Sequence, residues 1–151
     1  MAAWGDVERA VPELAAAVRA RFEAAKHATM ATLRRDGAPR ISGTEVEFSG
    51  GNVWLGSMPG TLKAPDLRRD PRLAIHSPTS DPAPDGTAWA GEAKLAGTAT
   101  EVSGEPAPGQ QGHRFVVDVT EVVLTRLGDP PDHLLVESWH PDRGYQRRER
   151  R

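Results

Sequence analysis

Residues Asn52–Ser77 read NVWLGSMPGTLKAPDLRRDPRLAIHS, and this segment decides the fold that we expect. It opens with a short apolar strand at Val53–Leu55 and passes through a loop of small residues at Gly56–Gly60. A helix is expected at Thr61–Arg69, and its internal proline limits it to one or two turns. A second strand follows at Leu73–His76. The segment is therefore predicted as strand, loop, short helix and strand.

The loop and helix start in this segment carry groups that suit an anion. Ser57 and Thr61 supply hydroxyls, and Lys63 supplies an ammonium on the same turn. A helix N-terminus adds unpaired N–H groups and a partial positive charge. The pattern is not a P-loop, because Lys63 does not directly follow Gly60 and no Ser or Thr follows Lys63. A phosphate site and a purely structural helix cap are both compatible with these residues.

The segment before this one contains two more strands. His27–Leu33 and Pro39–Phe48 are rich in apolar and β-branched residues, and Asp36-Gly37 lies between them. Asp-Gly tolerates the positive φ that tight hairpin turns require. Ser49–Asn52 marks the next turn and leads into the strand at residues 53–55. These strands are predicted to form an antiparallel meander.

Three longer strands are expected after the segment. They lie at Ala88–Val102, His113–Leu127 and Leu134–Trp139, separated by loops rich in Pro and Gly. The alternation in the second of them slips near Glu121, which indicates a β-bulge. The total is about six or seven antiparallel strands with few helices. Such strands need closure to avoid exposed edges, so a mostly β protein built on a small β-barrel is expected.

The two ends of the chain differ from this β pattern. Leu14, Val18 and Phe22 form an apolar stripe, which predicts a long N-terminal helix within residues 1–26. Pro12 suits the first turn of this helix, and Asp6 is expected to cap a short turn before it. Residues 140–151 are polar and are expected to form a loosely held tail. A chain of 151 residues is about one ordinary domain, so residues 1–151 are taken as a single domain.

Composition excludes several classes of protein. The net charge of -2 gives no electrostatic case for nucleic acid as a partner. The absence of cysteine excludes disulfides, cysteine-ligated zinc and a thiol nucleophile. No apolar run approaches the roughly 18 residues of a membrane span, and the N-terminus does not resemble a secretory signal. A cytoplasmic protein without membrane contact is expected.

No side chain has the spacing of a catalytic acid–base pair, a nucleophile elbow or a metal site. The five histidines are isolated from one another in sequence, and each is interpreted as structural or exposed, with haem ligation by one of them as the alternative. They are His27, His76, His113, His133 and His140. We therefore expect no catalytic side chain and no metal ligand set.

The order of these motifs resembles the pyridoxamine 5′-phosphate oxidase-like FMN-binding split barrels, and in particular their actinobacterial branch of flavin- and deazaflavin-dependent oxidoreductases. The resemblance covers roughly residues 27–127. The motifs that carry it are Ala31-Thr32-Leu33, Asp36-Gly37, Pro39–Ser42, Thr61-Leu62-Lys63, Asp66–Arg72, Leu73–Ser77 and Gly91–Thr100. The resemblance implies a split β-barrel with an N-terminal helix and one short internal helix.

The resemblance also implies cofactor-binding residues around the second and third strands. Arg40 matches a basic residue that reaches the flavin, and the backbone of Arg40, Ile41 and Ser42 would line the isoalloxazine ring. Ser57 and Met58 match the loop beside the ring and the ribityl chain. The phosphate would be held by the Thr-x-Lys pair, Thr61 and Lys63.

Further residues are implied by the later strands. Glu92 and Lys94 match polar residues that contact the cofactor across a dimer interface. Trp139 and Arg143 resemble a C-terminal Trp-and-Arg element of the oxidase. The resemblance also implies the partners: a homodimer with the cofactor at its interface, and a small-molecule substrate over the ring.

Two departures from the oxidase leave the cofactor open. Leu62 stands where the oxidase has an arginine, and Glu45 where it has a lysine. Both FMN and deazaflavin (F-420) therefore fit the pattern. The expected function is a flavin- or deazaflavin-dependent oxidoreductase, in which the cofactor performs the hydride chemistry. The alternatives are a non-catalytic carrier or sensor that binds flavin, deazaflavin or haem, and a structural dimer without a ligand.

Overall fold

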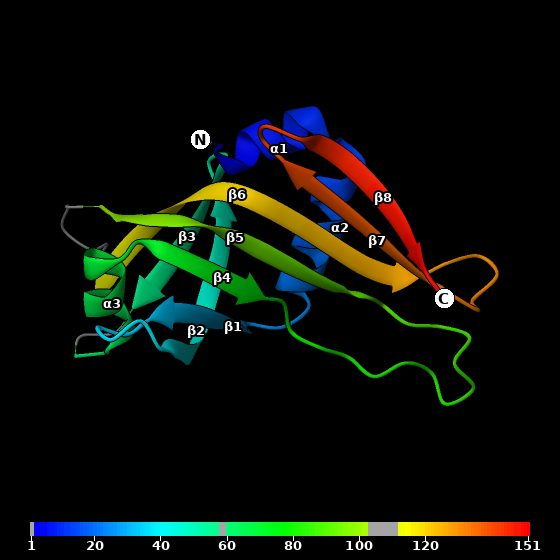
Figure 1. The fold of residues 1–151 in the computed structure, drawn as a ribbon, viewed down its shortest axis with the longest axis horizontal. Helices are drawn as coiled ribbons and strands as arrows, with labels where there is room; N and C mark the ends of the chain where they lie inside the picture. Colours follow the sequence, from blue (N-terminus) through cyan, green and yellow to red (C-terminus); the bar gives the residue numbers. More distant parts are fainter. Residues whose placement is uncertain (1, 58–59, 103–111) are drawn as a thin grey trace.

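The computed structural model describes residues 2–57, 60–102 and 112–151, and Met58 lies outside them. Its elements, in chain order, are α1 (Trp4–Ala10), α2 (Pro12–Glu23), β1 (His27–Leu33), β2 (Pro39–Ser49), β3 (Asn52–Ser57), α3 (Lys63–Arg69), β4 (Arg72–His76), β5 (Glu92–Glu101), β6 (His113–Leu127), β7 (Leu134–His140) and β8 (Gly144–Arg150). The mostly β class predicted from the sequence is confirmed (Figure 1).

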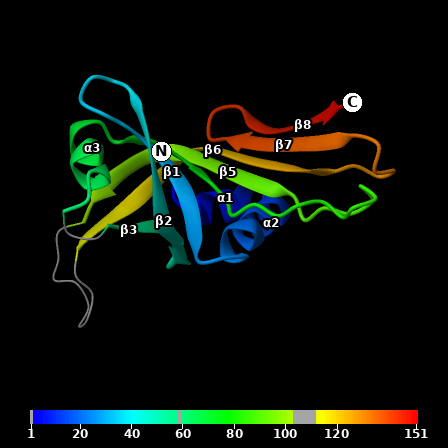
Figure 2. The same cartoon turned by 90° about the horizontal axis from the view of Figure 1, so that it is seen from below.

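The sheet of this described part is antiparallel throughout and closes on itself. Its strand order is β3-β2-β1-β4-β5-β6-β7-β8, and β3 also pairs with β6. Strands β1 to β6 thus form a barrel, while β7 and β8 extend the sheet outside β6 (Figure 2). The predicted meander β1–β2–β3 is present, and Gly37 takes a φ of +85° in its first turn.

The predicted bulge in β6 is also confirmed. Ala96 of β5 faces Glu121, but the next residue, Gly97, faces Val119, so one residue of β6 is skipped. An extra residue in one strand increases the local twist and bends the strand. The bend lets β6 pair with β3 through its first half and with β7 through its second.

The barrel interior is filled by apolar side chains from most strands. Met30, Leu55, Ile75, Leu95 and Val117 are buried there. Helix α2 places its predicted stripe of Leu14, Val18 and Phe22 in the same core and contacts β5 and β6. Burial of apolar side chains, at about 25 cal/mol per Å², is the main favourable term that holds the helix on the barrel.

The predicted N-terminal helix is confirmed as α2, which begins at Pro12, but a second helix, α1, precedes it where only a short turn was expected. Two helices occupy the region, and Val11 between them has φ -141° and ψ 68°. The residue before a proline is disfavoured in the α region, and Pro12 lacks the N–H that a continuous helix would use. Pro12 instead begins α2, while Trp4 of α1 packs against Phe48 with ring centroids 4.8 Å apart.

The prediction of a loose C-terminal tail was also wrong. Residues from Gly144 onward form β8, which pairs with the whole length of β7. Gly144 has a φ of +71°, which closes the turn, and the Tyr145 hydroxyl donates to Glu137 Oε1 at 2.8 Å. The described chain therefore has eight strands where six or seven were expected.

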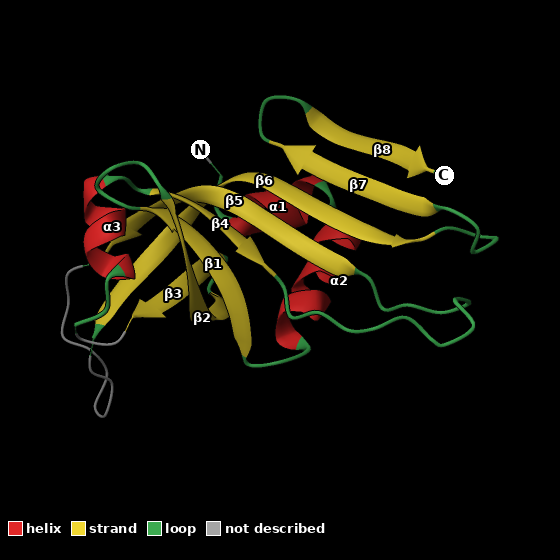
Figure 3. Ribbon diagram, turned by 60° about the horizontal axis from the view of Figure 1, so that its bottom comes forward, coloured by secondary structure: helices red, strands yellow, loops and turns green. Residues whose placement is uncertain are grey.

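Two boundaries differ from the sequence prediction. Strand β5 begins at Glu92, because residues 77–91 form a long loop in which Trp89 Nε1 donates to the Ser80 carbonyl at 2.8 Å. This loop runs beside the turn between β6 and β7 (Figure 3). Helix α3 begins at Lys63 and not at Thr61. No helix of the described residues is long and apolar enough to cross a membrane.

Candidate functional site

The first half of β2 and the end of β3 diverge from each other, and α3 contacts β2 beside this gap. Strand β2 pairs with β1 through residues 39–45 but with β3 only through Val46–Ser49. The end of β3, Gly56 and Ser57, pairs with β6 instead. The first half of β2 therefore has an edge without a strand partner in the described chain. We call the contact line between α3 and residues 40–43 of β2 the seam.

Lys63 forms the first contact of the seam. Its Nζ donates to the Gly43 carbonyl at 2.7 Å. Burial lowers the pKa of the Lys63 ammonium, and the nearby Glu45 carboxylate acts in the opposite direction. Ser57 Oγ at the end of β3 and Thr61 Oγ1 just before α3 hydrogen-bond to each other. The predicted hydroxyls and ammonium thus lie on one short segment beside β2.

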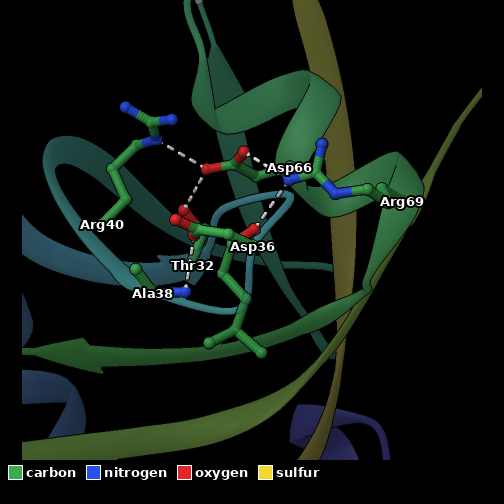
Figure 4. Close-up of polar contacts among 7 residues, drawn as sticks. Thr32, Asp36, Ala38, Arg40, Asp66 and Arg69 are labelled. Atoms are coloured by element: carbon green, nitrogen blue, oxygen red, sulfur yellow. Dashed lines mark hydrogen bonds and ion pairs between the residues drawn. The ribbon is translucent and has the colours of Figure 1, made fainter.

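Asp66 forms the second contact of the seam, through a cluster that the sequence analysis did not predict (Figure 4). It accepts hydrogen bonds from Arg40 Nε at 2.7 Å, Arg69 Nη2 at 2.8 Å and Thr32 Oγ1 at 2.9 Å. Burial acts to raise the pKa of this carboxyl, but the hydrogen bonds from these three residues together hold it below its ordinary value. Asp66 is thus an ionised, buried carboxylate that joins β1, β2 and α3.

A depression of about 210 Å³ lies beside the seam on the outer face of the barrel. It is lined by Thr29, Ala31, Ile41, Ala74, Ile75, His76 and Lys94. Ile41, Ala31 and Ala74 face one another across three strands, and Thr29, His76 and Lys94 form the next row. Small side chains at adjacent positions of neighbouring strands leave the hollow. Gly43, which accepts from Lys63, is the partner of Thr29, so the seam borders the depression.

His76 is held in an oriented position in the wall of this depression. Its Nδ1 lies 2.7 Å from the Ser77 carbonyl oxygen, and its Nε2 lies 3.4 Å from Glu92 Oε2. From the sequence, this histidine is interpreted as structural or exposed. The alternation of residues on β4 predicts that Ala74 and His76 share one face of the sheet. Only the cross-strand register shows which side chains lie beside them.

A second hollow, of about 250 Å³, lies between the loop of residues 77–91 and the turn from β6 to β7. Its lining, Ser80, Pro82, Trp89, Leu127 and Leu134, contains no charged side chain. The depression on the outer face has Lys94 in its wall and Lys63 at its border, so it is the better site for an anionic ligand with a flat apolar body.

The structure brings some of the predicted site residues together and separates others. Ile41 and Lys94 line the depression, and Glu92 contacts His76 in its wall. Arg40 and Ser42 alternate with Ile41 along β2, and Arg40 turns toward α3.

Trp139 and Arg143 do not join this depression within one chain. Trp139 belongs to the hydrophobic core, and Arg143 is exposed in the turn between β7 and β8. Their cofactor role stays a prediction.

Comparison with known proteins gives one family. A family model for pyridoxamine 5′-phosphate oxidase matches residues 14–135, which is most of the chain. No curated protein sequence matches.

Several solved structures share the fold. One is a pyridoxamine 5′-phosphate oxidase-related, FMN-binding protein from Nostoc punctiforme, with 12% identity, a TM-score of 0.62, and coverage of 93% of this chain and 96% of that chain. Another is PhzG from Burkholderia lata 383 in complex with tetrahydrophenazine-1-carboxylic acid, with 11% identity, a TM-score of 0.62, and coverage of 95% and 90%. An F420 reductase has 16% identity, a TM-score of 0.50, and coverage of 68% and 92%.

At such identities these structures show a common fold. The family model, by contrast, matches the sequence over both the seam and the strands that line the depression. The chain belongs to the pyridoxamine 5′-phosphate oxidase family.

Proposed function

We propose that this protein is an oxidoreductase that binds FMN or a deazaflavin and acts on a small organic substrate. The observation that carries the proposal is the pairing of a depression, hollowed where Ala31 and Ala74 are small, with a seam that bears two cations, Arg40 and Lys63. A flavin nucleotide has the matching parts, a flat ring and a phosphate. FMN binding in one structural relative and an F420 reductase among the others support the choice of cofactor class.

The residues of the seam and the depression have separate roles in this proposal. Lys63, with the Ser57–Thr61 hydroxyl pair, would hold the phosphate together with Arg40. The ring would lie against β1, β2 and β4, where Ala31, Ile41 and Ala74 offer a nonpolar surface. The bound cofactor supplies the hydride chemistry, and the protein supplies binding, orientation and electrostatics.

We also propose that two copies of the chain pair through the outer face of the barrel. Ile41 is 75% exposed there although it is a large apolar residue. Its cross-strand neighbours Ala31 and Ala74 are small and uncharged. A second copy would cover this face and close the depression, which on one chain is open. A closed site protects the cofactor from water and strengthens electrostatic contacts.

The visible absorption spectrum of the purified protein, together with mass analysis of the released ligand, tests the cofactor class. A flavin or deazaflavin spectrum with the corresponding mass is expected. A haem spectrum, or no binding of either flavin class at micromolar concentration, would contradict the proposal. Turnover is then measured as the bleaching and recovery of the cofactor band with reductant and candidate acceptors. Binding without turnover would identify a carrier or sensor.

A further inference from the structure

Arg40 uses its guanidinium differently from two other arginines that pair with carboxylates. Arg68 donates through both Nε and Nη2 to Glu101, at 2.7 and 2.8 Å. Arg72 donates through both Nε and Nη2 to Asp70, at 3.0 and 2.7 Å. Arg40 donates to Asp66 through Nε alone. The carboxylate partner of Arg40 thus leaves both terminal amino groups available.

The two terminal nitrogens of Arg40 form no hydrogen bond or ion pair with any residue that the structure describes. The side chain is nevertheless only 20% exposed, against 45% for Arg68 and 70% for Arg72. A partly buried guanidinium with unused N–H donors is well suited to bind an anion, because the paired donors match the spacing of phosphate oxygens.

Asp66 is placed so that it determines where these donors point. It is 3% exposed and is fixed by Thr32 from β1 and by Arg69 from its own helix. In Figure 4 the terminal nitrogens of Arg40 lie on the side of the guanidinium away from the Asp66 carboxylate. Asp66 also lies three residues after Lys63, so both belong to the same face of α3. That face contacts β2 twice, at Gly43 and at Arg40.

We propose that Asp66 is a positioning residue that turns the terminal nitrogens of Arg40 toward the phosphate group of the cofactor. This inference rests on the proposed function. The ligand class is a phosphate monoester on a flat ring system, and the consequence is a preference for the phosphorylated cofactor. FMN and riboflavin differ only in that phosphate, so the ratio of their dissociation constants measures the effect.

Binding of FMN and of riboflavin to the apoprotein, followed by flavin fluorescence, tests the inference. We expect the wild type to prefer FMN. Arg40→Ala and Asp66→Asn should each weaken FMN binding about tenfold, as expected for loss of one charge-assisted contact, and leave riboflavin binding unchanged. The double variant should be no weaker than Arg40→Ala, since Asp66 acts through Arg40. Additive losses in the double variant, or equal losses for riboflavin, would overturn the inference.

Arg68→Gln is the matched control, because it removes an arginine–carboxylate pair of the same helix, with Glu101, and leaves both Asp66 and Arg40 in place. It should leave the FMN-to-riboflavin ratio at the wild-type value. Arg40→Lys decides the question if Asp66→Asn does not fold. This variant keeps the positive charge but lacks the guanidinium that Asp66 holds. The preference for FMN over riboflavin should therefore fall. An unchanged preference would refute the positioning role of Asp66.

The wild type separates failure of this inference from failure of the proposed function. Equal affinity of the wild type for FMN and riboflavin would refute the positioning role of Asp66, but the protein would still bind a flavin. Binding of neither, with no deazaflavin binding, would remove the proposed function and the inference with it.

Discussion

The sequence pattern predicts that Lys63 binds phosphate, and the structure places this residue beside β2. We expect Lys63→Ala to weaken FMN binding by roughly 1.5–3 kcal/mol, because one charge-assisted contact to the phosphate is lost. Titration of the apoprotein with FMN measures this. Lys26→Ala is the control, since Lys26 is exposed and its ion pair with Glu45, at 3.5 Å, lies on the surface. Equal affinities for the two variants would place the phosphate elsewhere.

The carboxylates around α3 make stability depend on acid pH. Hydrogen bonds from Arg72 lower the pKa of Asp70 to about 2, and those from Arg68 lower that of Glu101 to about 2. The pKa of Asp66 is lowered as well, since its three hydrogen bonds outweigh burial. A lowered pKa means that the folded state holds the ionised form more strongly than the unfolded chain does.

This stabilisation is therefore present above the unfolded pKa of about 4 and is lost as pH falls toward about 2. Denaturant unfolding at a series of pH values should show the free energy of unfolding falling across this window. Asp66→Asn should reduce the slope, because one of the three carboxylates no longer titrates. A free energy of unfolding that does not change between pH 4 and pH 2 would contradict the lowered pKa values of these carboxyls.

At the scale of elements, the bulge in β6 depends on a residue without a side chain in β5. A Cβ at Gly97 would lie 2.1 Å from the Asp118 carbonyl oxygen, which is backbone and cannot rotate away. Gly97→Ala should therefore destabilise the protein by about 2 kcal/mol or more, the cost of forcing apart packed strands. Gly56→Ala in β3 is the control, because a Cβ there meets no atom within 4 Å. Thermal unfolding of both variants measures the difference in stability. Equal melting temperatures would show that β5 and β6 can move apart at little cost.

At the scale of the whole molecule, the outer face of the barrel is the surface that a second copy would cover. Ile41→Asp places a charge at the centre of this face and should yield monomers from the proposed dimer, because an unpaired charge is costly to bury. Light scattering after size exclusion measures the mass. Val102→Asp is the control, since Val102 is also an exposed apolar residue but does not line the depression. A monomeric wild type, or a dimer that persists in Ile41→Asp, would refute pairing through this face.

Much of the fold could be predicted from local patterns. The alternation of apolar residues located the barrel strands, and the slip of phase near Glu121 located the bulge. The two errors arose where local signals compete. Residues 4–10 were expected to form only a short turn, but they form α1, a separate helix that ends before Pro12 begins α2. The polar residues of β8 have no apolar alternation, and they form a strand because β7 offers an unpaired edge.

The candidate site was predictable only in part. Ser57, Thr61 and Lys63 lie close together in sequence, so their chemistry was visible as a motif. Arg40 and Asp66 are 26 residues apart, and no pattern in the chain predicts that they meet. The hollow at Ala31, Ile41 and Ala74 likewise depends on which positions of three strands stand opposite one another.

The order of motifs over residues 27–127 therefore indicated the family, and segment Asn52–Ser77 indicated the turn that suits a phosphate, because residue types at short spacing determine turns, short helices and local donors. Tertiary structure alone decided that the end of the chain is a strand, that Asp66 holds Arg40, and that a depression borders the seam. The physical reason is that strand register and barrel closure bring distant residues into contact, and these arise from packing of the whole barrel rather than from any one segment.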